Sequence, residues 1–249
     1  MPNWPLVSPD VSSDHHLVRA ASDEVGLRRE SRVEAGDVPL WLARLHRSLP
    51  VGSEVHISIG GSLPIPEDDL IEGAGFSTDG PLSTRLETIP DTVAPHMNML
   101  VCGLNPGKVS ADLGVNFANK GNRFWPAALA AGVVETDRAA DHALLHSGIG
   151  FTDLAKRTTT RADEINGAEF RSGAARLERL VRWLQPDVFL MVGLTGWRQA
   201  VDGKAASGWQ TEPFGGRPVY LMPNTSGLNA HETLESLVVH LEKAQAGPV

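Results

Sequence analysis

The sequence predicts an α/β fold in which helices cover both faces of a mostly parallel sheet. From Met97 onward, short apolar runs alternate with stretches that carry apolar residues at helical spacing. The run over 188–192 is continuously apolar, as expected for a strand that is covered on both faces. With 249 residues, the chain is long enough for one large domain and an appendage.

The main part of the chain is expected to alternate strands and helices. Strands are predicted over 97–102, 188–192 and 218–222, where apolar runs are followed by Gly or Pro. Apolar spacing predicts helices over 122–131, 139–146, 168–184, 196–201 and 229–243. The solvent-facing side of the helix over 168–184 is expected to carry Arg171, Arg176, Arg179 and Arg182.

The first 95 residues show weaker patterns. Residues 1–36 are polar and charged, and we expect them to be mobile or loosely attached. A helix is predicted over 37–49, strands over 55–59 and 84–89, and a loop over 64–81. The sequence therefore predicts a polar N-terminus over 1–36, a small α+β appendage of unknown role over 37–95, and a main domain over 96–249.

Composition limits the classes of function. The single cysteine, Cys102, lies in an apolar run, so neither an internal disulfide nor an iron–sulfur cluster is expected. No apolar run is long enough to cross a membrane and no signal-peptide pattern opens the chain, which predicts a cytoplasmic protein. We expect no metal and no cofactor.

The charge is distributed unevenly. The net charge is −8, but residues 1–95 hold 7 Lys/Arg and 15 Asp/Glu, whereas residues 96–249 hold 15 of each. A neutral main domain is able to bind a polyanion through a local patch. Because affinity for nucleic acid scales with the number of phosphates neutralised, such a domain is expected to bind DNA weakly and to contact few phosphates.

The segment over 103–125 is the most informative part of the chain. Gly103–Gly107 reads Gly-Leu-Asn-Pro-Gly and follows a predicted strand, and open α/β sheets bind ligands at the carboxyl ends of their strands. Glycines let backbone amides approach a ligand closely, and Asn105 is the one polar side chain of the turn. Phe117 is able to stack on a planar ring. The segment therefore predicts a pocket for a flat polar molecule.

A second loop, over 223–229, reads Pro-Asn-Thr-Ser-Gly-Leu-Asn and also follows a predicted strand. Both loops are expected at the same edge of the sheet, where they face one cleft. Small polar residues before a predicted helix suit phosphate binding. Leu228 is apolar where water is expected, which fits a wedge that enters a base stack.

These motifs resemble those of the mismatch-specific uracil-DNA glycosylases, a group that also contains the thymine-DNA glycosylases. The family motif Gly-(Ile/Leu)-Asn-Pro-Gly stands at Gly103–Gly107, and Asn-(Arg/His)-Phe-Trp stands at 122–125 with unchanged spacing. The family loop Pro-Asn-Pro-Ser-Gly-Leu-Ser is close to 223–229. The resemblance covers the chain from Met97 to Ala244 and leaves residues 1–95 unmatched.

The resemblance implies a three-layer α/β/α uracil-DNA-glycosylase-like fold and a monofunctional DNA N-glycosylase. Such an enzyme flips uracil opposite guanine out of double-stranded DNA and hydrolyses its bond to the sugar, which leaves an abasic site. Thymine and other damaged pyrimidines are further candidate substrates. The implied partner is double-stranded DNA with G·U or related mismatches, and the implied role is base excision repair at a bacterial nucleoid, with no membrane, metal or cofactor.

The resemblance also assigns roles to single residues. Asn105 matches the residue that holds the attacking water, and as an amide it orients this water rather than acting as a strong base. The substrate-binding positions are Leu104, Gly107, Ser110, Phe117 and Asn122. The DNA-binding positions are Asn224, Ser226, Gly227, Leu228 and Asn229, of which the last three match the wedge.

Departures from the family pattern leave the range of bases open. Ala230 and His231 follow the wedge where the family often has Arg, which predicts a weaker grip on DNA, and Thr225 replaces a Pro. Asn105 also fits an ordinary turn residue, and Phe117 a core residue. The alternative function is a weak or inactive module of the same fold that binds mismatched or abasic DNA. The single cysteine argues against an iron–sulfur uracil glycosylase.

Overall fold

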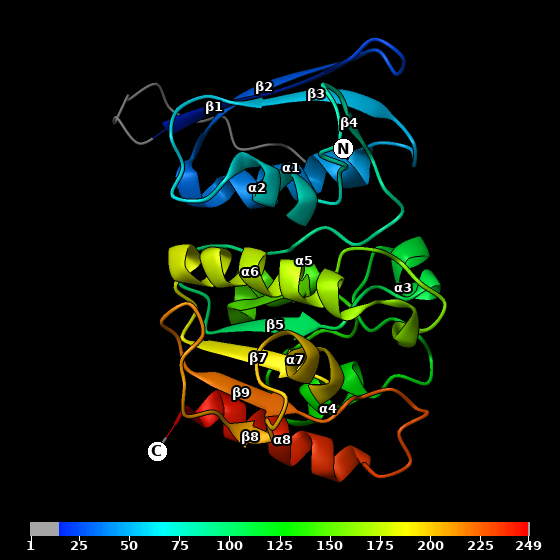
Figure 1. Ribbon diagram of the computed structural model, residues 1–249, viewed down its shortest axis with the longest axis vertical. Helices are drawn as coiled ribbons and strands as arrows, with labels where there is room; N and C mark the ends of the chain where they lie inside the picture. Colours follow the sequence, from blue (N-terminus) through cyan, green and yellow to red (C-terminus); the bar gives the residue numbers. More distant parts are fainter. Residues whose placement is uncertain (1–14, 249) are drawn as a thin grey trace.

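The computed structural model describes residues 15–248, which form two sheets with helices between and outside them (Figure 1). One sheet has four antiparallel strands in the order β2-β1-β3-β4, and the other has five strands in the order β6-β5-β7-β9-β8. In Figure 1 the layers run from the antiparallel sheet through α1 and α2, then α6, to the second sheet, with α4 and α8 beyond it.

The five-stranded sheet is parallel except for its edge strand β8. Every residue of its four parallel strands is buried, which explains the continuously apolar runs of β7 and β9 and the apolar run that opens β5. The strands are β5 (Met99–Gly103), β6 (Ile149–Asp153), β7 (Val188–Val192), β8 (Gly208–Trp209) and β9 (Val219–Met222).

Helices cover both faces of this sheet. Leu100 and Cys102 of β5 belong to the apolar core on the side of α6 and α7, whereas Met99 and Val101 belong to the core on the side of α4 and α8. The expected three-layer α/β/α fold is therefore confirmed. The helices of this domain are α3 (Lys108–Leu113), α4 (Phe124–Ala130), α5 (Ala140–Ser147), α6 (Gly167–Leu184), α7 (Leu194–Ala200) and α8 (Leu234–Ala246), with a 3-10 turn η2 (Ala162–Glu164).

The N-terminal part contains more regular structure than its composition predicts. Part of the segment 1–36, expected to be loosely attached, forms a hairpin that pairs with β3; residues 1–14 lie outside the described residues. Charged side chains alternate along β2 and stay exposed, so the strand forms without a long apolar run. The elements are β1 (His15–Ser22), β2 (Leu27–Glu34), η1 (Ala35–Asp37), α1 (Val38–Ser48), β3 (Glu54–Ile59), α2 (Glu67–Gly73) and β4 (Ser83–Thr84).

Two further expectations for this part are corrected. The predicted loop over 64–81 contains α2, whose first turn carries Glu67, Asp68 and Asp69, and acidic residues stabilise a helix N-terminus. The predicted strand over 84–89 is reduced to β4, because the chain then leaves the sheet toward the main domain.

The appendage and the main domain share one core. Apolar residues of α1 and α2, such as Leu42 and Leu70, belong to the same buried cluster as Leu177 and Leu180 of α6. Polar contacts cross the same boundary, since Arg179 of α6 pairs with Asp69 of α2 at 2.6 Å. Arg176, which was expected in solvent, is 2% exposed, because its guanidinium turns inward to Asp91 and to the Asp153 backbone oxygen of β6.

The register of the parallel sheet places the two motif loops at one edge. Cys102 of β5 pairs with Met191 of β7, and the next residue of β7, Val192, pairs with Met222 of β9, so the strands that precede both loops end together. This expectation is confirmed. The predicted helix over 229–243 begins later, at Leu234, because Thr233 caps it by accepting from Ser236 N.

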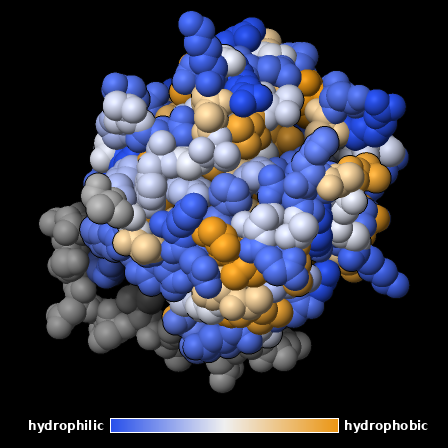
Figure 2. Space-filling view, turned by 90° about the horizontal axis from the view of Figure 1, so that it is seen from below, coloured by the Kyte–Doolittle hydropathy of each residue, from blue (hydrophilic) through white to orange (hydrophobic). Residues whose placement is uncertain are grey.

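No helix among the described residues is long and apolar enough to span a membrane. Figure 2 shows the molecule from the side of α8, where hydrophilic residues predominate and hydrophobic ones form small separate groups.

Candidate active site

The side chain of Asn105, just after β5, is fixed by another part of the chain. Its Nδ2 donates hydrogen bonds to the backbone oxygen of Arg157 at 3.0 Å and to Thr159 Oγ1 at 2.8 Å. A third bond reaches the backbone oxygen of Pro106 at 3.2 Å. Thr159 is 3% exposed, so one of the acceptors that hold the Asn105 amide is a buried hydroxyl.

This arrangement determines which way the Asn105 amide points. A backbone oxygen accepts hydrogen bonds and never donates them, so the group that faces Arg157 and Pro106 is the NH₂. Oδ1 is then the other end of the amide, and no donor among residues 15–248 reaches it. The site therefore presents one oriented acceptor at the end of β5, which is the group that an attacking water needs.

Gly103, the last residue of β5, is required by its neighbours. A Cβ at this position would overlap Asp153 Oδ1 and would lie 3.4 Å from Phe117 Cζ. The first glycine of the motif thus allows a carboxyl from β6 and an aromatic ring to meet beside the Asn105 turn.

Asp153 is a buried acid that none of the sequence motifs contains. It is 4% exposed and accepts a hydrogen bond from Asn116 Nδ2 at 3.0 Å. Burial raises the pKa of the Asp153 carboxyl to about 6, against the opposing charge of Lys156. Asn116 Oδ1 is a buried acceptor with no partner among the described residues. The site therefore combines a titratable acid with a buried acceptor that has no partner among the described residues.

The raised pKa of Asp153 predicts a pH-dependent effect of Asp153→Asn on stability. A raised folded-state pKa makes the contribution of the group to stability largest at low pH, and this contribution is lost as the pH rises through about 6. An amide at this position never ionises, so the variant is expected to melt at a higher temperature than the wild type at neutral and alkaline pH. The difference in melting temperature between the two proteins is expected to shrink as the pH falls from about 6 toward 3.8, the ordinary pKa of an Asp carboxyl. Thermal melting of both proteins across this window measures it, and a gap that does not change with pH contradicts it.

Phe117 is held in a strained position beside this acid. Its φ is 56°, in the left-handed region that non-glycine residues rarely adopt. Its ring stacks on Phe124 with centroids 4.4 Å apart and an interplanar angle of 25°. Ser110 is 7% exposed, and its Oγ accepts from Ala118 N at 3.1 Å, which ties α3 to the Phe117 loop. Ser110 is therefore buried and not a solvent-facing loop residue.

The other residues predicted to bind the substrate lie around the same turn. Leu104 uses its carbonyl oxygen to accept from Ala155 N at 2.9 Å, which leaves its N–H as the backbone group for a ligand. Gly107 has no heavy atom within 4 Å of an added Cβ, so the space beside it is open. Asn122 uses Oδ1 to accept from Phe124 N at 2.9 Å, which caps α4. Only the side-chain NH₂ of Asn122 is left for a substrate.

The loop over 223–229, called the wedge loop below, carries its apolar residue into solvent. Leu228 is 96% exposed, the highest value among the large exposed hydrophobic residues described. The loop is shaped by its own polar groups: Ser226 N donates to Asn224 Oδ1 at 2.9 Å, and Asn229 Nδ2 donates to the Asn224 oxygen at 2.8 Å. These bonds use the Ser226 amide and the Asn229 side-chain NH₂ as donors, but only oxygens of Asn224, so the NH₂ of Asn224 and the Ser226 hydroxyl are the side-chain donors left for a phosphate.

The wedge loop packs backbone to backbone on the loop before α4. A Cβ on Gly227 would lie 2.5 Å from the Gly121 oxygen, so only glycine fits there. Arg123 N donates to the Thr225 oxygen at 2.9 Å, and Thr225, which replaces the family proline, is fully buried. This contact connects the second and third motifs.

The guanidinium of Arg123 supports the wedge loop from its inner side. Nη2 donates to the backbone oxygens of Ser226 at 2.9 Å and Asn229 at 2.8 Å, and Nη1 donates to the oxygen of Glu232. Arg123 therefore binds three backbone carbonyls that lie on both sides of Leu228.

The comparison with protein families agrees with this geometry. The sequence matches the family model of the uracil DNA glycosylase superfamily over residues 90–244. The chain belongs to this superfamily. Membership makes DNA the substrate and uracil-DNA-glycosylase-type repair the class of function. The match begins after β4, so the superfamily domain does not include the antiparallel sheet, α1 or α2.

Sequence reasoning missed several residues of this superfamily site. Asp153 ends a strand whose apolar pattern is interrupted by Gly150, although a polar residue at the end of a buried run is a usable signal. Thr159 lies in a run of three threonines, and nothing in the sequence distinguishes it from its neighbours. Asn116 and Arg157 act through contacts between distant segments, which one sequence does not reveal.

Proposed function

We propose that this protein is a monofunctional uracil-DNA glycosylase that removes uracil opposite guanine from double-stranded DNA. The observation that supports the proposal is the fixed Asn105 amide, whose NH₂ is held by Arg157 and Thr159 so that Oδ1 is the end left for a ligand, at the strand edge that also bears the wedge loop. An ordinary turn asparagine would not need a buried threonine and a remote carbonyl to orient it.

The chemistry follows from these groups. A uracil stacked on Phe117 leaves as an anion when the bond from its N1 to the sugar C1′ breaks, and the sugar becomes oxocarbenium-like. Backbone N–H groups near Leu104 and Gly107 are suited to stabilise the leaving anion. Asn105 Oδ1 accepts one hydrogen of a water, whose oxygen then bonds to C1′. The proton released from this water passes to solvent, because an amide takes no proton at neutral pH.

Leu228 is suited to offset part of the free-energy cost of flipping the base. Extrusion of a base costs a few kcal/mol, and least for a mismatched base. An exposed leucine on a rigid loop replaces the lost stacking when it enters the gap. The proposed preference for uracil opposite guanine rests on this dependence on weak pairing. Thymine and other damaged pyrimidines remain candidate substrates, with the acid at Asp153 next to the stacking ring as a second contact for the base.

A single-turnover assay tests this function. Purified protein in excess is incubated with duplexes that carry U opposite G, U opposite A, or T opposite G, and alkali then cleaves any abasic site. Cleavage is expected fastest for G·U. An intact G·U strand at enzyme excess contradicts the proposal. Binding of G·U or abasic duplex without cleavage would instead support the inactive binding module.

Arg123 is expected to act on flipping through the wedge. Arg123→Met removes the donors to three carbonyls, and charged hydrogen bonds of this kind contribute about 1.5–3 kcal/mol each. We expect about a tenfold loss in excision rate. The loss should shrink when Leu228 is already alanine, because both changes then affect one element. Single-turnover rates of the two single variants and the double variant measure this.

Arg138→Met is the matched control, since Arg138 pairs with its exposed neighbour Asp137. It should leave the rate unchanged. Fully additive losses for Arg123→Met and Leu228→Ala contradict a role of Arg123 in positioning the wedge.

A further inference from the structure

The segment that holds Asn105 is itself held by the part of the chain that precedes the superfamily domain. Arg157 and Thr159 supply the acceptors for Asn105 Nδ2. The residues on both sides of Arg157 are bound by residues 87–89, through the Lys156 backbone oxygen and the Thr158 hydroxyl, and residues 87–89 lie before the match to the superfamily.

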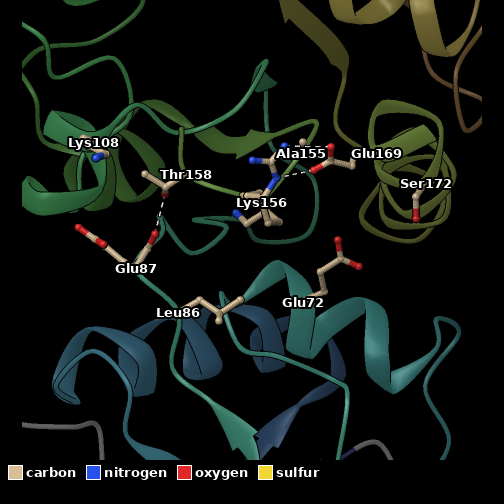
Figure 3. Close-up of a pocket in the computed structure, with 10 residues that line it drawn as sticks. Glu72, Leu86, Glu87, Lys108, Ala155, Lys156, Thr158, Glu169 and Ser172 are labelled. Carbon is tan, nitrogen blue, oxygen red and sulfur yellow. Dashed lines mark hydrogen bonds and ion pairs between the residues drawn. The ribbon is translucent and has the colours of Figure 1, made fainter. Parts of the chain in front are cut away.

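Three contacts join the two segments, of which the bond between Thr158 and Glu87 is drawn in Figure 3. Thr88 Oγ1 donates to the Lys156 oxygen at 2.5 Å, and Thr158 Oγ1 donates to the Glu87 oxygen at 2.6 Å. Lys156 Nζ donates to the Ile89 oxygen. The acceptor carbonyl of Arg157 lies between these two anchored neighbours, so its position depends on them.

The appendage fixes residues 86–91 in turn. His46 of α1 donates from Nε2 to the Leu86 oxygen at 3.0 Å, and burial lowers the pKa of His46 to about 3, which keeps its ring neutral. Leu86 N donates to the Gly75 oxygen at 2.9 Å, and Asp91 N donates to the Gly73 oxygen at 2.8 Å, at the end of α2. A continuous series of hydrogen bonds thus runs from α1 and α2 to Asn105.

A cavity lies beside this series of hydrogen bonds, whereas apolar packing of α1 and α2 against α6 joins the two parts elsewhere. The cavity has a volume of about 540 Å³ and lies between α2 and residues 155–158, with Glu72, Lys108 and Ser172 among its lining residues. Figure 3 shows Glu72 and Leu86 on one side and Lys156 and Thr158 on the other.

We propose that the N-terminal appendage is a positioning element of the active site, which sets the orientation of Asn105 through residues 87–89 and 156–159. The proposal rests on the proposed function. Thr88 and Thr158 are its positioning residues, since neither touches Asn105. The physical basis is the steep dependence of rate on placement, where a displacement of about 1 Å costs about 100-fold.

Thr88→Val and Thr158→Val in the full-length protein test the proposal, because each removes one hydroxyl and keeps the side-chain shape. Each is expected to lower the single-turnover rate of uracil excision about tenfold. The affinity for an abasic duplex should stay the same, since the wedge loop is not involved. Thr158 is half-buried, so its variant folds even if loss of the buried Thr88 hydroxyl destabilises the protein.

Two controls separate positioning from a purely structural role. Thr160→Val changes an exposed threonine of the same segment and should leave the rate unchanged. In an Asn105→Ala background, Thr158→Val should have no further effect, because it acts through Asn105. A wild-type rate for Thr158→Val, or an equal loss in both backgrounds, overturns the positioning role. Absence of excision by the wild-type protein instead overturns the proposed function itself.

Discussion

Asn105→Ala is expected to lower the single-turnover rate of uracil excision at G·U by about 1,000-fold, within the range that a positioned catalytic group contributes. The affinity for an uncleaved duplex should change little, because the wedge loop and Phe117 remain. The variant removes the only side-chain acceptor of the turn and leaves the buried Thr159 hydroxyl in place. Rates at enzyme excess and binding to the same duplex measure the two quantities separately.

Thr159→Val is the companion variant. It keeps Asn105 Oδ1 but removes the hydroxyl that accepts from Nδ2 and donates to the Arg161 oxygen at 2.8 Å. An intermediate loss of about tenfold is expected, since the carbonyls of Arg157 and Pro106 still hold the amide. A wild-type rate for Asn105→Ala would show that the water is held by another group.

Arg176→Met is expected to cost about 3–5 kcal/mol in the free energy of unfolding, because it leaves a buried carboxylate with one cation in place of two. Asp91 accepts from Arg176 Nη1 at 2.6 Å and from Lys156 Nζ at 2.9 Å, with side chains that are 2%, 5% and 5% exposed for Arg176, Lys156 and Asp91. These two cations hold the pKa of Asp91 below its ordinary value against the opposing effect of burial. Denaturant unfolding of the variant measures the loss.

Arg182→Met on the same helix is the matched control. Arg182 pairs with Glu178 at the surface, with side chains 63% and 46% exposed, and such pairs contribute about 0–1 kcal/mol. If Arg176→Met lowers the free energy of unfolding as little as Arg182→Met does, the buried cluster of Arg176, Asp91 and Lys156 does not stabilise the fold as expected.

The sequence was sufficient to predict the parallel sheet and the loops at its edge. Continuous apolar runs predict β5, β7 and β9, and the order of three motifs predicts the family. The strand β6 was missed, because Gly150 and the preceding glycine turn interrupt its apolar pattern. Because this strand was missed, Asp153, which ends it beside Gly103, was missed as well.

The appendage and its boundary with α6 were predictable only in part. Helix α1 and strand β3 have clear periodicity, but the hairpin of β1 and β2 is stabilised by cross-strand pairing of charged residues such as Arg19 and Glu30. Arg176 looked like a solvent-facing residue because its three arginine neighbours on α6 share its spacing. Its burial depends on Asp91, which is far away in the sequence.

The most direct test of hydrolysis at Asn105 is the fate of the base and the sugar in one turnover on a G·U duplex in heavy-oxygen water. We expect free uracil that carries no label, an abasic sugar that carries the heavy oxygen at C1′, and no protein–DNA adduct trapped by borohydride. Failure to release uracil at enzyme excess, or a trapped covalent adduct, would contradict hydrolysis by a water that Asn105 orients.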